Sequence, residues 1–273
     1  MVRIREFVAW GFDQNDYRPS LDGLVPAVER GCCAVARRES YVQADPVCNH
    51  LPAHVTDLLT RQVQRSDLQA EMQGLEWSMG VVDLRCLLAF QRRLIFDEHF
   101  PQAEVPADDD WSSLVALAFG SPIPIAYTTV VSSASKVQFQ SENPNLQVRV
   151  YKENTNTPLQ IHGGSPFFEV AEYRGRWFLR DGYHRAFHLL RANIMHFPAV
   201  IIRAKTLAEL GPVQPWFFSE NTLFSPQPPR LPDFLDDELT IEYTRPRLLK
   251  TLRVTIEESV EPAQPAPDLG ERQ

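Results

Sequence analysis

The fold is decided by one stretch, WFLRDGYHRAFHLLRANI at residues 177–194, because it joins a strand to a sharply bounded helix. Its aromatic and apolar start is typical of a buried strand, and the Asp181-Gly182 step that follows is typical of a turn. Apolar residues then recur with helical spacing at Ala186, Leu189 and Leu190, with Phe187 beside them. Asn193 stands where a helix often ends in a left-handed residue. The stretch therefore predicts a helix from near Gly182 to near Ala192.

The segments on both sides of this helix are predicted strands. Upstream lies PFFEVAEYRGRWFLRD (166–181), in which two apolar runs flank Arg174-Gly175, and a glycine there permits the positive φ of a hairpin turn. Downstream lies FPAVIIRA (197–204), a short apolar run of the buried-strand type. Together these segments predict a hairpin, a turn, a helix and a further strand, in that order.

The rest of the chain contains weaker signals. The clearest N-terminal helix lies within PAHVTDLLTRQVQRSDLQAEMQGLEW (52–77), and a short buried strand is predicted at VVDL (81–84). A further helix, at 106–120, begins near Asp110. Two strands rich in β-branched residues are predicted in IPIAYTTVVSSA and LQVRVYKE, with the polar loop SSASKVQFQSENPN between them. One more strand and a short helix are expected in 239–258.

These elements predict an α+β fold with a small mixed β-sheet and flanking helices. A helical N-terminal extension covers 1–75, and the core covers 76–210 with an insertion at about 98–162. A Pro-rich, aromatic segment covers 211–261 and is expected to wrap the surface as extended chain with a terminal strand. The polar tail 262–273 is expected to be disordered. The aromatic anchors expected in the wrap are Trp216, Phe217, Phe218 and Phe224.

Composition and charge limit the classes of partner and the location that we expect for this protein. The formal net charge of −8 argues against nucleic acid as a partner, because phosphate contacts need clustered Lys and Arg. No window approaches the roughly twenty apolar residues of a membrane span, and the N-terminus lacks the apolar run of a signal peptide. We therefore expect a cytoplasmic protein without a membrane partner, and its cysteines are expected to be reduced.

Two groups of residues have the chemistry of metal ligands. The run Asp108, Asp109 and Asp110 suits the positive end of the helix predicted at 106–120, so these carboxylates are interpreted as caps, with a metal site as the alternative. The second group is Cys33, Cys48 and His50, which lack a Cys-x-x-Cys pair.

The Asp181–Arg185 turn has the chemistry of a phosphate site. The first turn of a helix leaves backbone N–H groups unpaired, and Gly182 permits close approach to the backbone. Arg185 is able to contact phosphate with two nitrogens, and His184 adds a donor. The alternative is an ordinary capped helix start with solvated polar residues. A zinc pair of His184 and His188 is a third interpretation, without an evident third ligand.

The same residues carry a family resemblance. The pieces PFFEV, RWFLRDGYHRA, LLRANI and FPAVII resemble, in their order, the core of the ParB/sulfiredoxin-like superfamily, and VVDLRCLLAFQRR is similar to its opening strand and loop. The chain departs from the pattern at Asn193, where glycine is usual, and in the long insertion. Tyr183 stands where sulfiredoxins have a reactive cysteine, so reductase chemistry of that kind is excluded. No helix-turn-helix follows the core, which argues against a sequence-specific DNA clamp.

The resemblance implies nucleotide or phosphate chemistry at the turn. It places the nucleotide contacts at Gly182, Tyr183, His184 and Arg185, and it makes Asp181 the candidate general base and metal contact. A second catalytic acid is expected, and the candidates are Glu169, Asp97 and Glu98, of which Glu169 is our choice. The implied cofactors are ATP or another nucleoside triphosphate and Mg²⁺.

The sequence and the resemblance leave three functions as alternatives. The first is a Mg-dependent phosphotransferase or nucleoside-triphosphate hydrolase. The second is a non-catalytic module that senses a nucleotide or binds a protein partner through the aromatic C-terminal segment. The third is a ParB-like nuclease or DNA-binding protein, against which the negative charge argues.

Overall fold

The computed structural model describes residues 1–13, 17–18, 20, 23–98, 104–121, 124–133, 135–150, 159–211 and 217–260. The chain is a mixed α+β protein, as predicted, and divides into two compact units. Unit 1 comprises Met1–Ile123 and Ser165–Arg247, and unit 2 comprises Pro124–Gly164 and Leu248–Gln273. No helix in the described ranges combines the length and the apolar character that crossing a membrane requires.

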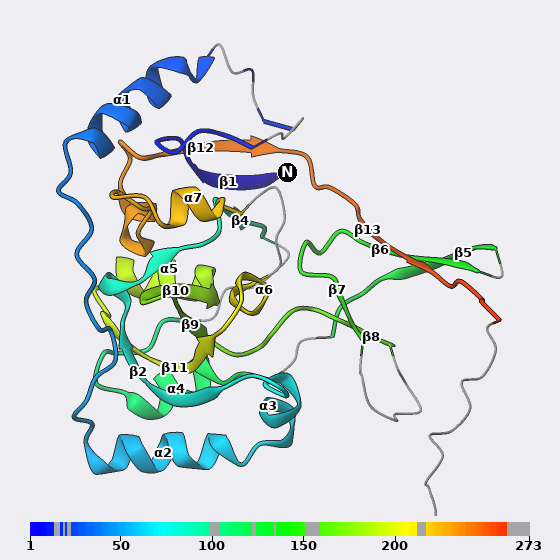
Figure 1. Cartoon of the computed structure of the whole chain (residues 1–273), viewed down its shortest axis with the longest axis horizontal. Coiled ribbons are helices and arrows are strands. Elements are labelled where there is room, and N and C mark those ends of the chain that lie inside the picture. The colour runs from blue at the N-terminus through cyan, green and yellow to red at the C-terminus, as the bar shows by residue number, and fades with distance from the viewer. Residues whose placement is uncertain are drawn as a thin grey trace, which may run out of the picture. The chain divides into compact units, whose positions relative to one another are not determined.

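Unit 1 is built on a five-stranded mixed sheet with the strand order β2-β11-β9-β10-β3 (Figure 1). Its strands are β2 (Trp77–Asp83), β3 (Leu88–Ala89), β9 (Glu169–Tyr173), β10 (Arg176–Asp181) and β11 (His196–Ala204). The pairs β2–β11 and β9–β10 are antiparallel, and β9–β11 and β3–β10 are parallel. The small mixed sheet predicted from the sequence is therefore present.

The predicted β9–β10 hairpin and the helix after it are confirmed. The hairpin turns at Arg174 and Gly175, whose φ angles of 50° and 78° are both positive. Helix α5 (Tyr183–Arg191) follows β10 directly and buries the apolar stripe that the sequence indicates. Asn193 has a φ of 60°, so the left-handed residue after the helix is also as predicted.

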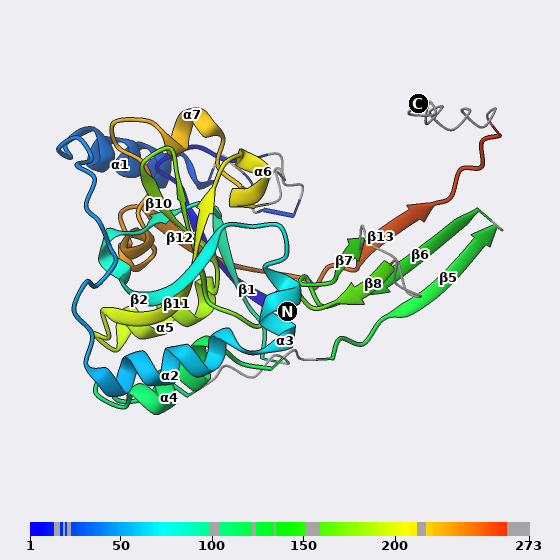
Figure 2. The ribbon, with the colours of Figure 1, turned by 60° about the horizontal axis from the view of Figure 1, so that its bottom comes forward.

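The other helices of unit 1 are short, and α2, α4 and α6 contact strands of the sheet. Their bounds are α1 (Val25–Ala36), α2 (Ala53–Val63), α3 (Ser66–Glu71), α4 (Trp111–Ala118), α6 (Leu207–Leu210), α7 (Glu220–Leu223) and two 3-10 turns, η2 (Leu84–Cys86) and η3 (Leu231–Leu235). Figures 1 and 2 both show α2 and α4 side by side near β2 and β11. The helix expected within 52–77 is thus two helices, α2 and α3.

A second sheet in unit 1 corrects the prediction of a helical N-terminal extension over 1–75, because its first strand lies in that range. It has the order β12-β1-β4, all antiparallel, with β1 (Val2–Phe7), β4 (Arg93–Phe96) and β12 (Thr240–Arg245). The sequence of β1 lacks the alternation of apolar and polar residues that predicts a strand, because the charged residues Arg5 and Glu6 are buried like their apolar neighbours. Glu6 is compensated by ion pairs with Arg18 and Arg93.

The segment after Gly211 is held by aromatic contacts but is not uniformly extended, since α7 and η3 lie within it. Phe217 stacks on Phe90 with ring centroids 4.7 Å apart, and Phe218 lies 5.8 Å from the Phe7 ring. Phe224 lies 6.0 Å from Phe178 in the core. The expected anchor Trp216 and the tail 262–273 lie outside the described residues.

Unit 2 contains two small antiparallel sheets. The first has the order β13-β6-β5, and the second is the pair β7–β8. The strands are β5 (Thr128–Ser133), β6 (Lys136–Ser141), β7 (Gln147–Val150), β8 (Leu159–His162) and β13 (Lys250–Thr255). Strand β6 corrects the predicted polar loop, because its Val137 and Phe139 alternate with polar residues and pair with both neighbours. Strand β13 takes the place of the short helix expected near the C-terminus.

Candidate functional site

The Asp181-Gly182 step lies where β10 ends and α5 begins. A bulge shifts the β9–β10 register between Leu179 and Asp181 and places Asp181 opposite Glu169. Gly182 has a φ of 101°, in the left-handed region that favours glycine. The Phe168 ring packs on its Cα so closely that a Cβ at Gly182 would collide with the ring. This glycine therefore serves a close contact within the protein.

Gly182→Ala is expected to lower the free energy of unfolding by roughly 2–3 kcal/mol. Strain at a positive φ accounts for about 1 kcal/mol, and the collision with Phe168 accounts for the rest. Urea denaturation measures the loss. Gly74→Ala is the matched control, because Gly74 has a φ of 80° and a Cβ there meets no atom within 4 Å. Equal losses in the two variants would contradict the importance of the Phe168 contact.

Tyr183 points into the core and is 5% exposed. Its hydroxyl donates to the Leu179 carbonyl oxygen at 2.7 Å and accepts the N–H groups of Phe90 at 2.6 Å and Gln91 at 3.1 Å. Burial raises the pKa of the phenol well above its ordinary value. Tyr183 thus ties α5 to the segment that follows β3.

Tyr183→Phe is expected to cost roughly 1–3 kcal/mol of stability, because two buried N–H groups lose their acceptor. Thermal or urea unfolding measures it. Tyr173→Phe, in the neighbouring strand β9, is the control and should change stability by less than about 0.5 kcal/mol. A neutral Tyr183→Phe would mean that water replaces the lost hydroxyl.

His184 also points into the protein. Its Nε2 donates to the Ile95 carbonyl oxygen at 2.8 Å, and its ring lies edge-on to Phe96 with centroids 5.5 Å apart. Burial lowers the pKa of the imidazole. The neutral ring therefore joins α5 to β4.

The Arg185 guanidinium donates hydrogen bonds to backbone carbonyl groups. Its Nη1 donates to Leu117 at 3.0 Å, Pro166 at 2.8 Å and, more weakly, Ala118 at 3.4 Å, and its Nη2 donates to Phe167 at 2.7 Å. Leu117 and Ala118 lie in the last turn of α4, where carbonyl groups have no partner within the helix. The guanidinium therefore joins α5, the end of α4 and the segment that leads into β9.

The carboxyl groups of Asp181 and Glu169 lie at opposite positions of β10 and β9. Glu169 is 1% exposed, accepts the Ser165 hydroxyl and forms an ion pair with Arg180. Asp181 accepts the Gly182 N–H and stays partly exposed. Burial and the neighbouring Glu169 charge raise the pKa of Asp181 to about 7. A carboxyl group that titrates near neutral pH is suited to proton transfer.

The turn thus brings the predicted site residues together, but most of them already contact other groups of the protein. Phe168 covers Gly182, and the polar side-chain groups of Tyr183, His184 and Arg185 bond to backbone groups. A phosphate contact by these three side chains would require them to give up those partners. The Asp181 carboxylate has no ion pair and no hydrogen bond to a group outside the turn within the described residues. The other candidate acid, Asp97, is held by Arg247 with two bonds of 2.7 Å.

The residues at the turn do not fit a Mg²⁺ site. This ion prefers six oxygen ligands in near-octahedral geometry, whereas Glu169 already bonds Ser165 and Arg180. Across the described part of the chain, no three His, Cys, Asp or Glu residues gather as metal ligands. The predicted cap is confirmed, since Asp110 accepts the Ser113 N–H at 3.1 Å.

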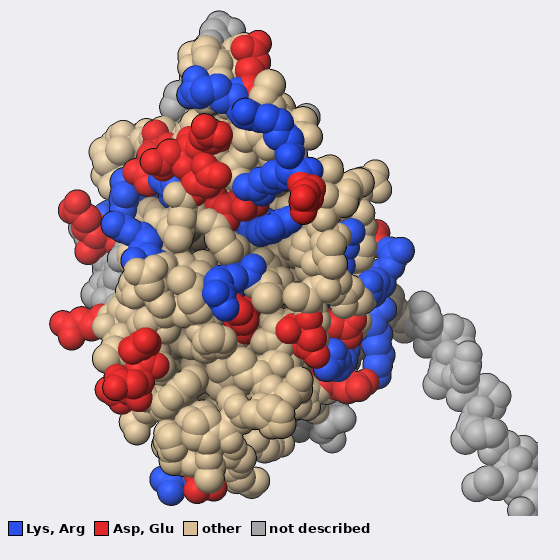
Figure 3. All heavy atoms as spheres, turned by 90° about the vertical axis from the view of Figure 1, so that its left-hand side faces the viewer, with Lys and Arg blue, Asp and Glu red and all other residues tan. Residues whose placement is uncertain are grey.

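A hollow elsewhere on unit 1, which we call the arginine hollow, has a volume of about 550 Å³. It is lined by Arg38, Glu39, Ser40, Tyr41, Val42, Ala44, Arg85, Cys86, Arg230 and Asp233. Figure 3 shows basic side chains gathered around a hollow on this face, with acidic side chains among them. The hollow is open to ligands, unlike the closed contact between Gly182 and Phe168.

The arginines of this hollow differ in their partners. Arg38 pairs with the buried Asp233 at 2.8 Å. Arg85 bonds Asp83 through Nε and Nη2, which leaves its Nη1 without a hydrogen bond in the described ranges. The Arg230 guanidinium has no acidic partner among the described residues and lies 5.8 Å from the Tyr41 ring centroid.

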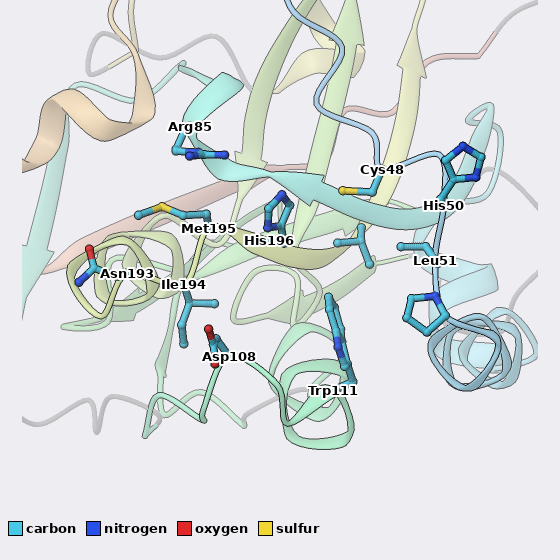
Figure 4. Close-up of a pocket in the computed structure, with 12 residues that line it drawn as sticks. Cys48, His50, Leu51, Arg85, Asp108, Trp111, Asn193, Ile194, Met195 and His196 are labelled. Atoms are coloured by element: carbon cyan, nitrogen blue, oxygen red, sulfur yellow. The ribbon is translucent and has the colours of Figure 1, made fainter.

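A second hollow of about 400 Å³, the tryptophan hollow, shares Arg85 with the first. Its lining is Cys48, His50, Leu51, Pro52, Val81, Arg85, Asp108, Trp111, Asn193, Ile194, Met195 and His196. In Figure 4, Arg85 and Cys48 lie on one side, Asp108 and Trp111 lie on the other, and His196 lies between them. The sequence contains no spacing signal for either hollow, because their residues come from distant segments.

Comparison of the chain with protein-family models, curated proteins and solved structures found no match.

Proposed function

We propose that the protein binds a phosphorylated small molecule in the arginine hollow and acts there as a binding module. The observation that carries this proposal is the Arg230 guanidinium, which lines the hollow without an acidic partner in the described ranges. Guanidinium groups bind phosphate through paired, charge-assisted hydrogen bonds. An accessible cation without a carboxylate partner is therefore available for a ligand anion.

Two neighbours of Arg230 support the proposal. Arg85 is fixed in direction by its bonds to Asp83, and it offers a further N–H-bearing nitrogen to the same hollow. The Tyr41 hydroxyl is buried without a hydrogen-bond partner among the described residues, and its ring lies beneath Arg230 and Arg176. The guanidinium groups of Arg230 and Arg85 therefore give a phosphate charged donors in one hollow.

The resemblance to the ParB/sulfiredoxin-like superfamily makes a nucleotide the first ligand to test. That resemblance places phosphate at Arg185, whereas the geometry favours Arg230, because the Arg185 donors are occupied by carbonyl groups. We also propose that the core has the ParB/sulfiredoxin-like fold. This is supported by the order of its elements, a hairpin (β9 and β10), a turn, a helix (α5) and a further strand (β11).

The test is calorimetric titration with ATP, ADP, CTP and pyrophosphate, with and without Mg²⁺. Arg230→Met should weaken binding about tenfold or more, because one charge-assisted contact is lost while the apolar stem is kept. Glu39→Gln should strengthen binding, because it removes a negative charge from the lining. Arg30→Met is the control, since Arg30 is exposed and lines neither hollow.

The outcomes separate the proposals. Binding that Arg230→Met weakens and Arg30→Met leaves unchanged supports the arginine hollow. Binding of none of the four anions removes the proposal, and so does binding with equal affinity in wild type and Arg230→Met.

A second candidate function is acid–base catalysis at Asp181, as the phosphotransferase or hydrolase interpretation requires. It is favoured by the pKa of Asp181, which lies near 7, and by its place opposite Glu169. If ATP binds, release of phosphate should be lost in Asp181→Asn while binding is kept. Turnover that is unchanged in this variant would exclude the residue as the base.

A further inference from the structure

The tryptophan hollow presents opposite charges on its two sides. Its upper side in Figure 4 carries Arg85, which follows β2, and its lower side carries Asp108 and Trp111 at the start of α4. All of these residues belong to unit 1, and the volume of about 400 Å³ lies in the range of small-molecule sites. The proposed phosphate ligand uses neither Asp108 nor Trp111.

The positive side is preorganised by Asp83. This carboxylate accepts Nε of Arg85 at 2.9 Å and Nη2 at 2.6 Å, and it accepts the Arg85 backbone N–H at 2.9 Å. The guanidinium is thereby held in one direction, with Nη1 left for a ligand. His196 stands beside it in the centre of the hollow and adds a ring N–H donor. This side suits a carboxylate.

The negative side is Asp108, the member of the acidic run that lines the hollow. Asp110 is engaged as the cap of α4 through Ser113, whereas Asp108 is exposed and has no hydrogen bond or ion pair in the described ranges. The Trp111 indole forms the adjacent wall of the hollow. A carboxylate and an aromatic ring on the same side of a hollow suit an ammonium group, which is attracted by the carboxylate charge and by the face of the ring.

We infer that the tryptophan hollow binds a zwitterionic amino acid, with the ligand carboxylate at Arg85 and its ammonium group between Asp108 and Trp111. The ligand carries its two charges at opposite ends, because Arg85 and Asp108 lie on opposite sides of the hollow. This site lies in a different hollow from the proposed phosphate site and its argument does not rest on that site, although both ligands would use Nη1 of Arg85.

The experiment is calorimetric titration of the full chain with glycine, β-alanine, 4-aminobutyrate and 6-aminohexanoate, which carry the same charges at increasing separation. We expect a longer member of the series to bind better than glycine. Its N-acetyl and methyl ester derivatives, which each lack one charge, should bind about tenfold or more weakly.

Variants locate the site. Asp108→Asn should weaken binding of the best ligand about tenfold or more, and Asp109→Asn, one residue along and outside the lining, should leave it unchanged. Trp111→Leu should weaken it further, and circular dichroism shows whether that variant is folded. Pyrophosphate binding should be insensitive to Asp108→Asn, so failure here and failure of the proposed phosphate site are distinguishable.

Three results would overturn the inference. They are no binding of any member of the series, equal binding of the methyl ester, and equal loss of affinity in Asp108→Asn and Asp109→Asn.

Discussion

Arg185→Met is expected to lower the free energy of unfolding by about 3–5 kcal/mol, because it removes the donors of backbone carbonyl groups in three segments. The end of α4 loses the partner of Leu117, and the segment before β9 loses the partners of Pro166 and Phe167. Methionine keeps most of the apolar stem and so isolates the loss of the guanidinium. Urea denaturation at pH 7 measures the change.

Arg191→Met is the control for this variant. Arg191 lies on the same helix α5 and is exposed, so its replacement should change stability by less than about 0.5 kcal/mol. An Arg185→Met protein of unchanged stability that no longer binds ATP would show the opposite, namely that the guanidinium turns outward to hold phosphate.

Asp181→Asn is expected to remove a pH-dependent loss of stability of roughly 2–4 kcal/mol. The folded-state pKa of Asp181, about 7, lies above its ordinary value of 3.8, so between these pH values the folded protein keeps a proton that the unfolded chain has released. The wild type should therefore lose stability as pH rises from about 4 to 7. Asparagine resembles the protonated carboxyl group, so the variant should lack this loss and be the more stable protein at pH 8.

Urea denaturation at pH 4.5, 6 and 8 for both proteins tests this expectation. Asp57→Asn, an exposed carboxylate on α2, should follow the wild-type pH dependence. Parallel curves for wild type and Asp181→Asn would show that Asp181 is ionised throughout, and the argument for proton transfer at this position would then fail.

Local chemistry made the centre of the fold predictable. The positive φ at Gly175, the left-handed Asn193 and the cap at Asp110 each follow from a residue type whose conformational preference is strong. The apolar spacing of α5 likewise follows from burial of one helix face. These features need no information beyond about ten neighbouring residues.

The turn shows where local reasoning fails. Gly182, His184 and Arg185 match the pattern of an anion site, yet their partners are Phe168, Ile95 and the carbonyl groups at the end of α4. These partners come from distant segments, and sequence spacing does not contain them. Burial of the charged residues of β1 was unpredictable for the same reason. Glu6 is typical of a solvent-facing residue, and only the fold brings its partners Arg18 and Arg93 beside it.

The position of β1 in its sheet has a consequence for biosynthesis. Strand β1 is synthesised well before β12, yet the two pair along one edge, so that Val2 lies opposite Arg245. Until β12 is translated, this edge lacks its partner strand, and Glu6 lacks the hydrogen bond from the Tyr243 hydroxyl. Pairing across so long a separation is slow, and exposed strand edges attract other chains. Unit 1 therefore completes its fold only after β12 has been synthesised, and a nascent chain halted before β12 is a natural client for chaperones.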